Sequence, residues 1–539
     1  MTKKITVLFV LFFTIQYVAM SQYVWSNVSL FGGANSAGTT IRFADDGPTT
    51  TYVAGSFDGT YNFGAFPLTC TGNNAGFAAK IDNGTISWAQ AFGGSSSSCD
   101  VVDVVQQNGF MYIIGNYTYF MTVGPVTINS AGGYDIFLLV LDGAGNFAAL
   151  STYGGPQDDN VAGMVANTNG DLYMTGYFSG TSMFGTVSLT SAGASDAFIS
   201  KLDAAGTVQW AHKGGGTNGD AATGIALIND LPYINGTFKG SNVMFGTNSV
   251  TITNNDYGVF LAKYDDAGNN IYVQKAAQSP SPSVKNLAAG GNKLFMCGVY
   301  TTSINIGGQA LPGNSGADIF VACFDSTGLK QWAKKGGSTG FADEVSYIAA
   351  EADGYCTIVG SNNSSIAFGS VSVPQTSYTE VYAFGFDLVG NAIYGLGAAG
   401  LGFQRGGFVK SVGVNKFIYA GMVEGSTTFS GNVLTSPAAA SFFIGEVSLG
   451  TLSNQELSTQ GQLFIHNLDN NGNILITILN QQAENDVVVS ITDITGKLLL
   501  NKALQNGQVQ LNTKDLATGT YIIRAAGEKI NVAQKFLVQ

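Results

Sequence analysis

The stretch DAFISKLDAAGTVQWAHKGG, Asp196 to Gly215, decides the fold of this chain. Its first half alternates apolar and polar residues as a half-buried strand does. A D-x-x-G turn then leads into a second strand that carries Trp210. Related stretches begin at Gly76, Asp135, Tyr257, Asp318 and Val381. The chain is therefore built from a repeat, and the period of the repeat must be established before any other feature is interpreted.

Three independent markers give the same period. The aspartate that opens the turn recurs at Asp82, Asp142, Asp203, Asp265, Asp325 and Asp387, in steps of 60, 61, 62, 60 and 62 residues, and Ser448 takes its place in a seventh copy. A glycine inside a strand-like run recurs at Gly55, Gly115, Gly176, Gly236, Gly298, Gly360 and Gly421. An apolar residue before a turn recurs at Phe63, Val123, Phe184, Phe245, Ile306, Phe368 and Phe429. Together they define seven copies of about 61 residues.

Each copy contains four short strand patterns and no helical periodicity. Seven copies of a four-stranded antiparallel unit predict an all-β, seven-bladed β-propeller rather than an open solenoid. The two ends of the repeat region support closure. Residues 25–33 read as a fourth strand without a third, and residues 440–450 read as a third strand without a fourth. Joining them completes the last blade, so we predict a closed propeller over residues 22–450.

The N-terminus has the pattern of a secretory signal peptide over residues 1–21. Lys3 and Lys4 precede an apolar run, Ile5 to Val18, and small residues at Ala19 and Ser21 precede Gln22. The run is shorter than the roughly 20 residues that a membrane helix needs, so no transmembrane span is expected. In an oxidising compartment Cys70 and Cys99, which lie in polar segments, have the option of forming a disulfide.

The composition limits the classes of partner. The chain has 539 residues, a net charge of −12 and 11% charged residues. This acidic balance argues against nucleic acid as a partner, because a binder of phosphate backbones needs a basic surface. Thr, Ser, Asn and Tyr must cover the exposed strands, and such a surface suits a glycan or a protein ligand.

The repeat ends at Gly450, and a different module follows it. Residues 451–462 read as a polar linker, and residues 463–539 are again rich in strand patterns. The run VVVSITDITGKLLL predicts a strand, a turn at Thr495 to Lys497 and a second strand. Alternation and spacing predict a small antiparallel β-sandwich of about 75–80 residues.

Two families resemble parts of this chain. Phe198, Lys201, Asp203, Gly206, Trp210, Gly214 and Gly215 carry a pattern similar to bacterial seven-bladed β-propeller repeats. The tail resembles the type A C-terminal sorting domain of the type IX secretion system (Por secretion) of Bacteroidota, at Asp493, Gly496, Lys497, Gly519, Tyr521 and Lys535. One segment departs from that family, because Ile465 to Leu468 stands where a Y-P-N-P-like sequence is usual. The resemblance implies that the tail engages the type IX translocon. It also implies that the protein is secreted or displayed at the outer-membrane surface.

No catalytic constellation, metal-binding motif or cofactor motif stands out, so we predict no catalytic residue, no metal and no cofactor. His212 occupies a strand position held by Gln90 and Lys334 in other copies, which favours a strand surface residue over a general base. Acids precede the first strand of several copies, at Asp100, Asp159, Asp220, Asp343 and Glu344. In a propeller they would gather at the mouth of the channel and attract a cation or a cationic ligand. The alternative is that each acid caps its own turn through backbone N–H groups, and we favour it.

The function predicted from the sequence is a secreted or cell-surface propeller that acts as a non-enzymatic binding or adhesion module. The alternative is a secreted enzyme that degrades a polysaccharide or a peptide with carboxylates at the channel mouth. Sequence spacing leaves both open, because propeller sites assemble from distant residues.

Overall fold

The computed structural model describes two compact units, 1–450 and 451–539, and the described residues form strands and turns with no helix. In the first unit the described residues are 23–31, 38–45, 49–252, 254–338, 343–375, 379–400, 402–413, 416–430, 432–436 and 440–449. In the second they are 462–467, 473–479, 487–493, 497–503, 508–513, 516–517, 519–526 and 531–538. The predicted signal peptide and residues 451–461 of the predicted linker lie outside this part of the chain.

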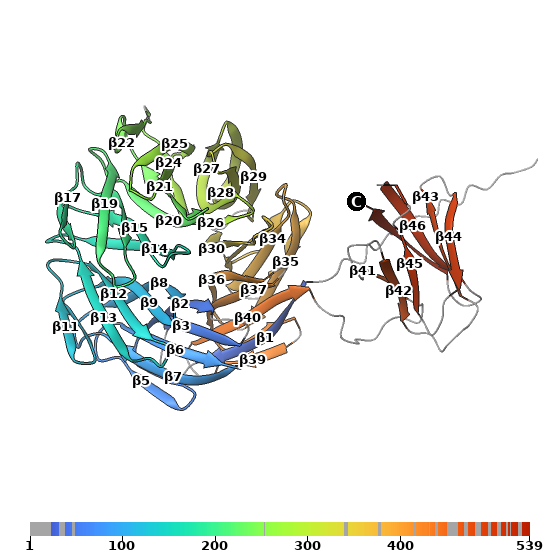
Figure 1. Cartoon of the computed structure of the whole chain (residues 1–539), viewed down its shortest axis with the longest axis horizontal. Coiled ribbons are helices and arrows are strands. Elements are labelled where there is room, and N and C mark those ends of the chain that lie inside the picture. The colour runs from blue at the N-terminus through green and yellow to red at the C-terminus, as the bar shows by residue number, and fades with distance from the viewer. Residues whose placement is uncertain are drawn as a thin grey trace, which may run out of the picture. The chain divides into compact units, whose positions relative to one another are not determined.

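The first unit repeats a four-stranded antiparallel sheet around a common centre (Figure 1). We call each sheet a blade and name it after its innermost strand. The innermost strands are β2 (Gly38–Asp45), β8 (Cys99–Gln107), β14 (Asp159–Ala166), β20 (Ala221–Ile228), β26 (Pro282–Gly290), β30 (Glu344–Ala350) and β36 (Gln404–Gly413). Each is followed outward by a second, a third and a fourth strand.

The second strands are β3 (Thr50–Phe57), β9 (Phe110–Tyr117), β15 (Leu172–Phe178), β21 (Leu231–Phe238), β27 (Lys293–Ile306), β31 (Cys356–Asn362) and β37 (Lys416–Val423). The third strands are β6 (Ala75–Asp82), β12 (Asp135–Asp142), β18 (Asp196–Leu202), β24 (Tyr257–Tyr264), β28 (Gln309–Asp325), β34 (Glu380–Phe386) and β40 (Ser441–Leu449). The fourth strands are β7 (Thr85–Phe92), β13 (Phe147–Tyr153), β19 (Val208–Gly215), β25 (Asn270–Ser279), β29 (Lys330–Gly336), β35 (Ala392–Gly400) and β1 (Tyr23–Phe31).

The β36 blade is completed by the N-terminal strand. Its order is β36, β37, β40 and β1, and β1 runs antiparallel to β40 with Trp25 opposite Val447. Trp25 is 2% exposed, and its ring meets Tyr419, Phe429 and Phe443 edge-on at 5.2, 5.3 and 6.2 Å between ring centroids. The two ends of the repeat region are therefore held together by a ladder of backbone hydrogen bonds and by an aromatic cluster.

The structure adds a hairpin that the four-strand prediction did not contain. It lies between the second and third strands, and β27 and β28 form it as an extension of their own ladder. The separate hairpins are β4 (Thr60–Phe63) with β5 (Phe66–Thr69), β10 (Phe120–Val123) with β11 (Val126–Asn129), β16 (Thr181–Phe184) with β17 (Val187–Thr190), β22 (Val243–Phe245) with β23 (Asn248–Val250), β32 (Ile366–Phe368) with β33 (Val371–Val373), and β38 (Ser426–Phe429) with β39 (Asn432–Thr435). The apolar marker of the repeat is the last residue before this turn, and a residue with positive φ follows it, a glycine such as Gly64 at φ 56° in six copies and Ser430 at φ 44° in the seventh, which permits the tight two-residue connection.

Tryptophans of three blades dock onto the D-x-x-G turn of the next blade. The indole N–H of Trp88 donates to Gly143 O at 3.3 Å, and those of Trp210 and Trp332 donate to Asp266 O and Leu388 O at 3.0 and 3.1 Å. The turn glycine has a positive φ in each case and lies under the indole ring, where a methyl group would collide with it. In these three blades the tryptophan therefore joins one blade to the next.

The second unit contains two antiparallel sheets. One has the order β41 (Gln462–Asn467), β42 (Asn473–Leu479), β45 (Gln508–Asn512), and the other β44 (Leu498–Ala503), β43 (Val488–Asp493), β46 (Gly519–Ala526), β47 (Asn531–Val538). Ile476 from the first sheet packs in one buried cluster with Val489, Ile491 and Ile523 from the second. The two sheets therefore share an apolar core.

The five cysteines are free thiols. Cys297, Cys323 and Cys356 are buried in one apolar cluster, where they pack as small hydrophobic residues. Cys99 is buried against Met121, with 3.5 Å between the sulfur atoms, and Cys70 is half-buried. Burial raises the pKa of the Cys99 thiol, so the thiol is unreactive in the folded protein.

Candidate functional site

Asp159 and Asp220 lie at the start of β14 and just before β20, and both side chains are fully buried. Asp159 accepts hydrogen bonds from Gly155 N at 2.7 Å and from the Ser182 hydroxyl at 2.5 Å. Asp220 accepts from Gly216 N at 2.7 Å and from Lys239 N at 3.0 Å. Burial raises the pKa of both carboxyl groups to about 6. These are the contacts of turn caps, as in the alternative interpretation of the sequence.

The other three predicted acids have different surroundings. Asp343 is 3% exposed and accepts from Ser338 N at 2.7 Å, so it also caps a turn. Asp100 is half-buried and accepts from the Asn74 amide at 2.5 Å and from the Ser98 hydroxyl at 3.3 Å. Glu344, one residue after Asp343, is exposed and lines a cavity of the channel. Among the described residues, no three acids, cysteines or histidines form a group that could hold a metal ion.

A second series of buried acids was missed in the sequence. Asp135, Asp196 and Asp318 begin or lie within the third strand of their blades, and each accepts from a backbone N–H four residues earlier. Each lies near one of the predicted acids, and its negative charge helps to raise the pKa of that neighbour. The pairs are Asp135 with Asp159, Asp196 with Asp220, and Asp318 with Asp343. Lys213 and Lys335 lie 3.4 Å from Asp196 and Asp318. The signal was present, since an aspartate opens three of the quoted repeat copies.

The innermost strands share a β-bulge that determines which residues face the channel. The register between the innermost and the second strand shifts at the same place in six blades. In the β26 blade the shift lies between Val284 and Asn286, so Lys285 has no residue opposite it on β27. The repeat glycine lies on the second strand beside this shift. A methyl group added to Gly298 would stand 2.5 Å from Ser283 O, and the equivalent glycines meet the equivalent carbonyl group. The marker glycine is therefore required by the close approach of this carbonyl group, and in six blades the bulge beside it re-aims a side chain of the innermost strand.

Two cavities lie along the innermost strands. One, of about 450 Å³, is lined mainly by the later halves of the strands and includes Asp103, Asn286 and Lys410. The other, of about 250 Å³, is lined by the earlier halves of four of them. It includes Arg42, Lys285, Arg405 and Glu344.

Asp103 is held by the protein around it. Its carboxylate accepts from Met164 N at 3.1 Å and from Val104 N at 2.9 Å, and burial raises its pKa although Arg42 lowers it. These contacts tie β8 to β14 at the channel and give Asp103 a structural explanation.

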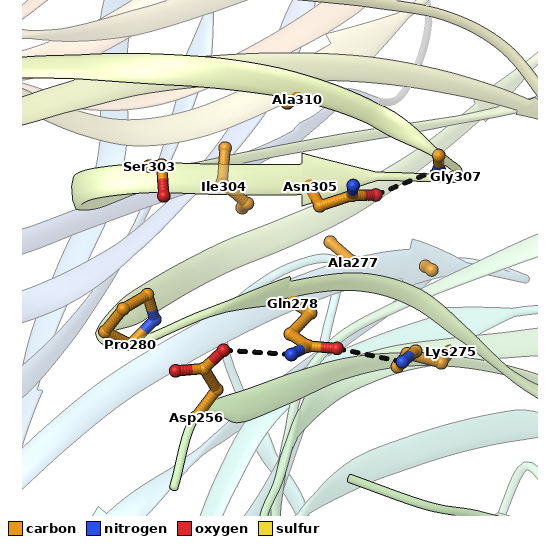
Figure 2. Close-up of a pocket in the computed structure, with 12 residues that line it drawn as sticks. Asp256, Lys275, Ala277, Gln278, Pro280, Ser303, Ile304, Asn305, Gly307 and Ala310 are labelled. Carbon is orange, nitrogen blue, oxygen red and sulfur yellow. Dashed lines mark hydrogen bonds between the residues drawn. The ribbon is translucent and has the colours of Figure 1, made fainter. Parts of the chain in front are cut away.

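A further cavity, of about 480 Å³, lies at the outer side, between β25 and the hairpin extension of β27 and β28 (Figure 2). Gln278 lies between Asp256 and Lys275 in its lining, donating to Asp256 at 2.9 Å and accepting from the Lys275 ammonium group at 2.9 Å. The opposite charges of this cavity are therefore linked to each other through Gln278.

His212 packs on Trp210, with 5.3 Å between ring centroids, and burial lowers its pKa. A methyl group on Gly268 of the next blade would meet both rings, so His212 belongs to the docking contact between blades.

The motif positions of the tail fall on the second sheet where the structure describes them. Asp493 accepts from Lys497 N at 3.0 Å across the turn between β43 and β44, and Gly496 lies outside the described residues. Gly519 begins β46, Tyr521 pairs with Phe536 of β47, and Lys535 pairs with Ile522.

Residues 470–539 match the family model described as the secretion system C-terminal sorting domain. Such a type IX sorting tail marks proteins that are secreted or attached at the cell surface. The protein is therefore a secreted or cell-surface protein. No helix among the described residues is long and apolar enough to cross a membrane.

No curated protein matches this chain in sequence. Similar solved structures include the subtype N10 neuraminidase-like protein of A/little yellow-shouldered bat/Guatemala, at 10% identity and TM-score 0.31, covering 79% of this chain and 100% of that chain. PorZ, a surface component of the type-IX secretion system of Porphyromonas gingivalis, has 11% identity and TM-score 0.20, covering 95% and 100%. Trypanosoma rangeli sialidase has 8% identity and TM-score 0.31, covering 95% and 87%.

Proposed function

We propose that this protein is a Bacteroidota cargo of the type IX secretion system that presents a closed seven-bladed β-propeller as a non-enzymatic binding or adhesion module. In this proposal residues 1–21 are a signal peptide and residues 22–450 form the propeller. Residues 451–462 are a linker, and residues 463–539 form a β-sandwich that engages the translocon. The observation that carries the proposal is the sorting-domain match over residues 470–539.

The distribution of acids supports binding rather than catalysis. Asp159, Asp220 and Asp343 are buried and each accepts a hydrogen bond from a backbone N–H group, so they are poorly placed to reach a substrate. A repeat whose shared residues make turns, bulges and contacts between blades is a scaffold, and its ligand contacts must come from residues that differ between blades.

Binding to immobilised extracellular polysaccharides and surface proteins tests the proposal, with the intact secreted protein as analyte. Saturable binding without turnover of the bound material supports a binding module. Turnover of a polysaccharide or peptide by the purified protein would contradict it and favour the secreted-enzyme alternative.

Among the predicted acids, Glu344 is the best candidate for a catalytic carboxylate in that alternative, because it is exposed and lines a channel cavity. If an enzyme is present, E344Q should abolish turnover with the fold intact. D220N, which alters a buried cap, serves as the matched control for a change in stability alone.

A further inference from the structure

The smaller channel cavity gathers positive charge in an acidic protein. The chain has only three arginines, and the two within residues 1–450, Arg42 and Arg405, both line this cavity of about 250 Å³. Lys285 is the third cationic lining residue, and Glu344 is the one acid. Against a net charge of −12 for the chain, this concentration of cations at one place requires an explanation.

Lys285 and Arg405 are not paired with any acid in the described part of the protein, whereas the charge of Arg42 lowers the pKa of the nearby Asp103 carboxyl group. Among the described residues, none of Arg42, Lys285 and Arg405 forms a salt bridge, and the side chains of Lys285 and Arg405 make no hydrogen bond. Arg405 is exposed and Lys285 is half-buried, so both remain accessible from the channel. Unpaired cations beside a cavity attract an anion, and the low-dielectric walls of the channel strengthen the attraction.

Arg42 is held in position by the protein around it. Its Nε donates to Val102 O at 2.7 Å and one terminal nitrogen donates to Ile41 O at 2.9 Å. The guanidinium group also lies over the rings of Tyr347 and Phe408, at 5.6 and 5.3 Å from the ring centroids, and these two rings line the larger channel cavity. A guanidinium group has five N–H donors, so these contacts leave donors available, and little side-chain entropy is lost when an anion binds.

A second, independent observation is the Ser361 hydroxyl group. Ser361 is 5% exposed, lines the same cavity, and its Oγ has no hydrogen-bond partner in the described part of the chain. Leaving a buried hydroxyl group unpaired costs free energy, which a ligand group at that place would recover. Thr40 and Ser346 add further polar atoms to the lining.

The lining indicates the chemistry of the ligand. Arginine pairs with a carboxylate through two parallel N–H···O bonds. Glu344, when ionised, can only accept hydrogen bonds, so it requires a donor such as a sugar hydroxyl group. A cavity of 250 Å³ is smaller than the ~300–1,000 Å³ pockets of drug-sized ligands, and it therefore suits one residue or one chain end.

We infer that this cavity binds a single acidic sugar residue, with its carboxylate held by Arg42, Arg405 and Lys285 and its hydroxyl groups by Glu344 and Ser361. The inference rests on the proposed binding function and names its ligand class. The ligand would be a uronic acid, free or at the end of an acidic polysaccharide.

Titration of the intact protein with galacturonate, followed by calorimetry or ligand-observed NMR, tests the inference. Methyl galactoside, which has hydroxyl groups and no charge, and inorganic sulfate, which has charge and no hydroxyl groups, serve as comparison probes. The inference predicts saturable galacturonate binding that exceeds both by at least tenfold and weakens as salt is added.

Variants connect the binding to this cavity. R405Q and K285Q should each weaken galacturonate binding by tenfold or more. K410Q, which removes a cation from the same strand as Arg405 but at the other channel cavity, should leave it unchanged. S361A should weaken binding without lowering the stability of the ligand-free protein, because it removes a hydroxyl group that has no partner.

Two results would overturn the inference. One is the absence of galacturonate binding to the unmodified protein. The other is binding that R405Q and S361A leave intact, or that sulfate matches. If uronate does not bind while the protein still binds another polysaccharide or a surface protein, the inference fails and the proposed binding function stands.

Discussion

Closure of the ring by Trp25 gives a sharp prediction. Trp25 is 2% exposed and lies among Tyr419, Phe429 and Phe443 between β1 and β40. A tryptophan buries about 200 Å² and each Å² contributes about 25 cal/mol, so its side chain contributes about 5 kcal/mol. Replacement of a buried aromatic residue by alanine commonly costs about 3–5 kcal/mol. We therefore expect W25A to lower the free energy of unfolding of the propeller by about 3–5 kcal/mol.

The matched variant W25F retains a ring at the same place. The indole N–H of Trp25 has no hydrogen-bond partner among the described residues, so phenylalanine loses packing but no hydrogen bond. Its expected cost is on the order of 1 kcal/mol. The difference between W25A and W25F isolates the aromatic contacts with Tyr419, Phe429 and Phe443, which lie on β37, β38 and β40.

Denaturant unfolding of the intact protein, followed by tryptophan fluorescence, measures both variants. All four tryptophans, Trp25, Trp88, Trp210 and Trp332, lie in residues 1–450, so the signal reports this unit and not the tail. Circular dichroism checks the variants that lack one probe. A loss below about 1 kcal/mol for W25A would refute the reasoning, because the first strand would then contribute little to the fold.

Three further predictions follow from buried and strained groups. Burial raises the pKa of Asp159 and Asp220 to about 6, so the folded protein holds these protons more tightly than the unfolded chain. Ionisation of the two carboxyl groups should therefore cost the folded protein no stability below about pH 4 and the full penalty above about pH 6. In thermal melts at several pH values, D159N or D220N should reduce this fall in stability with rising pH by about 1–3 kcal/mol. An unchanged pH profile would contradict this prediction. In the denaturant unfolding assay, G145A should lower the free energy of unfolding by at least about 1 kcal/mol more than G84A does. Both glycines have a positive φ, but only Gly145 lies under an indole ring. Equal losses would contradict a stabilising contact between the tryptophan and the turn. A thiol reagent should label Cys70 first and the other four cysteines only on unfolding, since those four are buried. Rapid labelling of Cys297 would contradict the packing of its side chain in the core. An unlabelled Cys70, together with the loss of two hydrogen atoms from the intact mass, would instead indicate a disulfide with Cys99.

The repeat region could be predicted well because its markers correspond to local physical requirements. The marker glycine is required by a carbonyl group of the innermost strand that lies against it, and the turn aspartate accepts hydrogen bonds from the turn backbone, as Asp142 does from Ala144 N at 2.9 Å. Such requirements recur from copy to copy, apart from the turn aspartate of the seventh copy, where Ser448 stands, and they can be read from spacing alone. The extra hairpin was missed because its strands have only three or four residues, which is too short for an alternating pattern to show.

The channel could not be predicted in the same way. The sequence grouped Asp343 with Glu344, but neighbouring residues of a strand face opposite sides, and the structure buries the first and exposes the second. Arg42, Lys285 and Arg405 belong to three different blades and share no motif. Only closure of the ring brings them to one cavity, so their proximity depends on tertiary structure that no local pattern encodes.

The most direct test of the account is the intact mass of the protein outside native cells, compared with that of a strain expressing the chain without residues 451–539. The account predicts an extracellular or surface form that begins near Gln22 and ends near Gly450. It also predicts that the shortened chain stays inside the outer membrane. Full-length protein in the periplasm, or export of the shortened chain to the cell exterior, would contradict the central claim that the tail delivers the propeller to the surface.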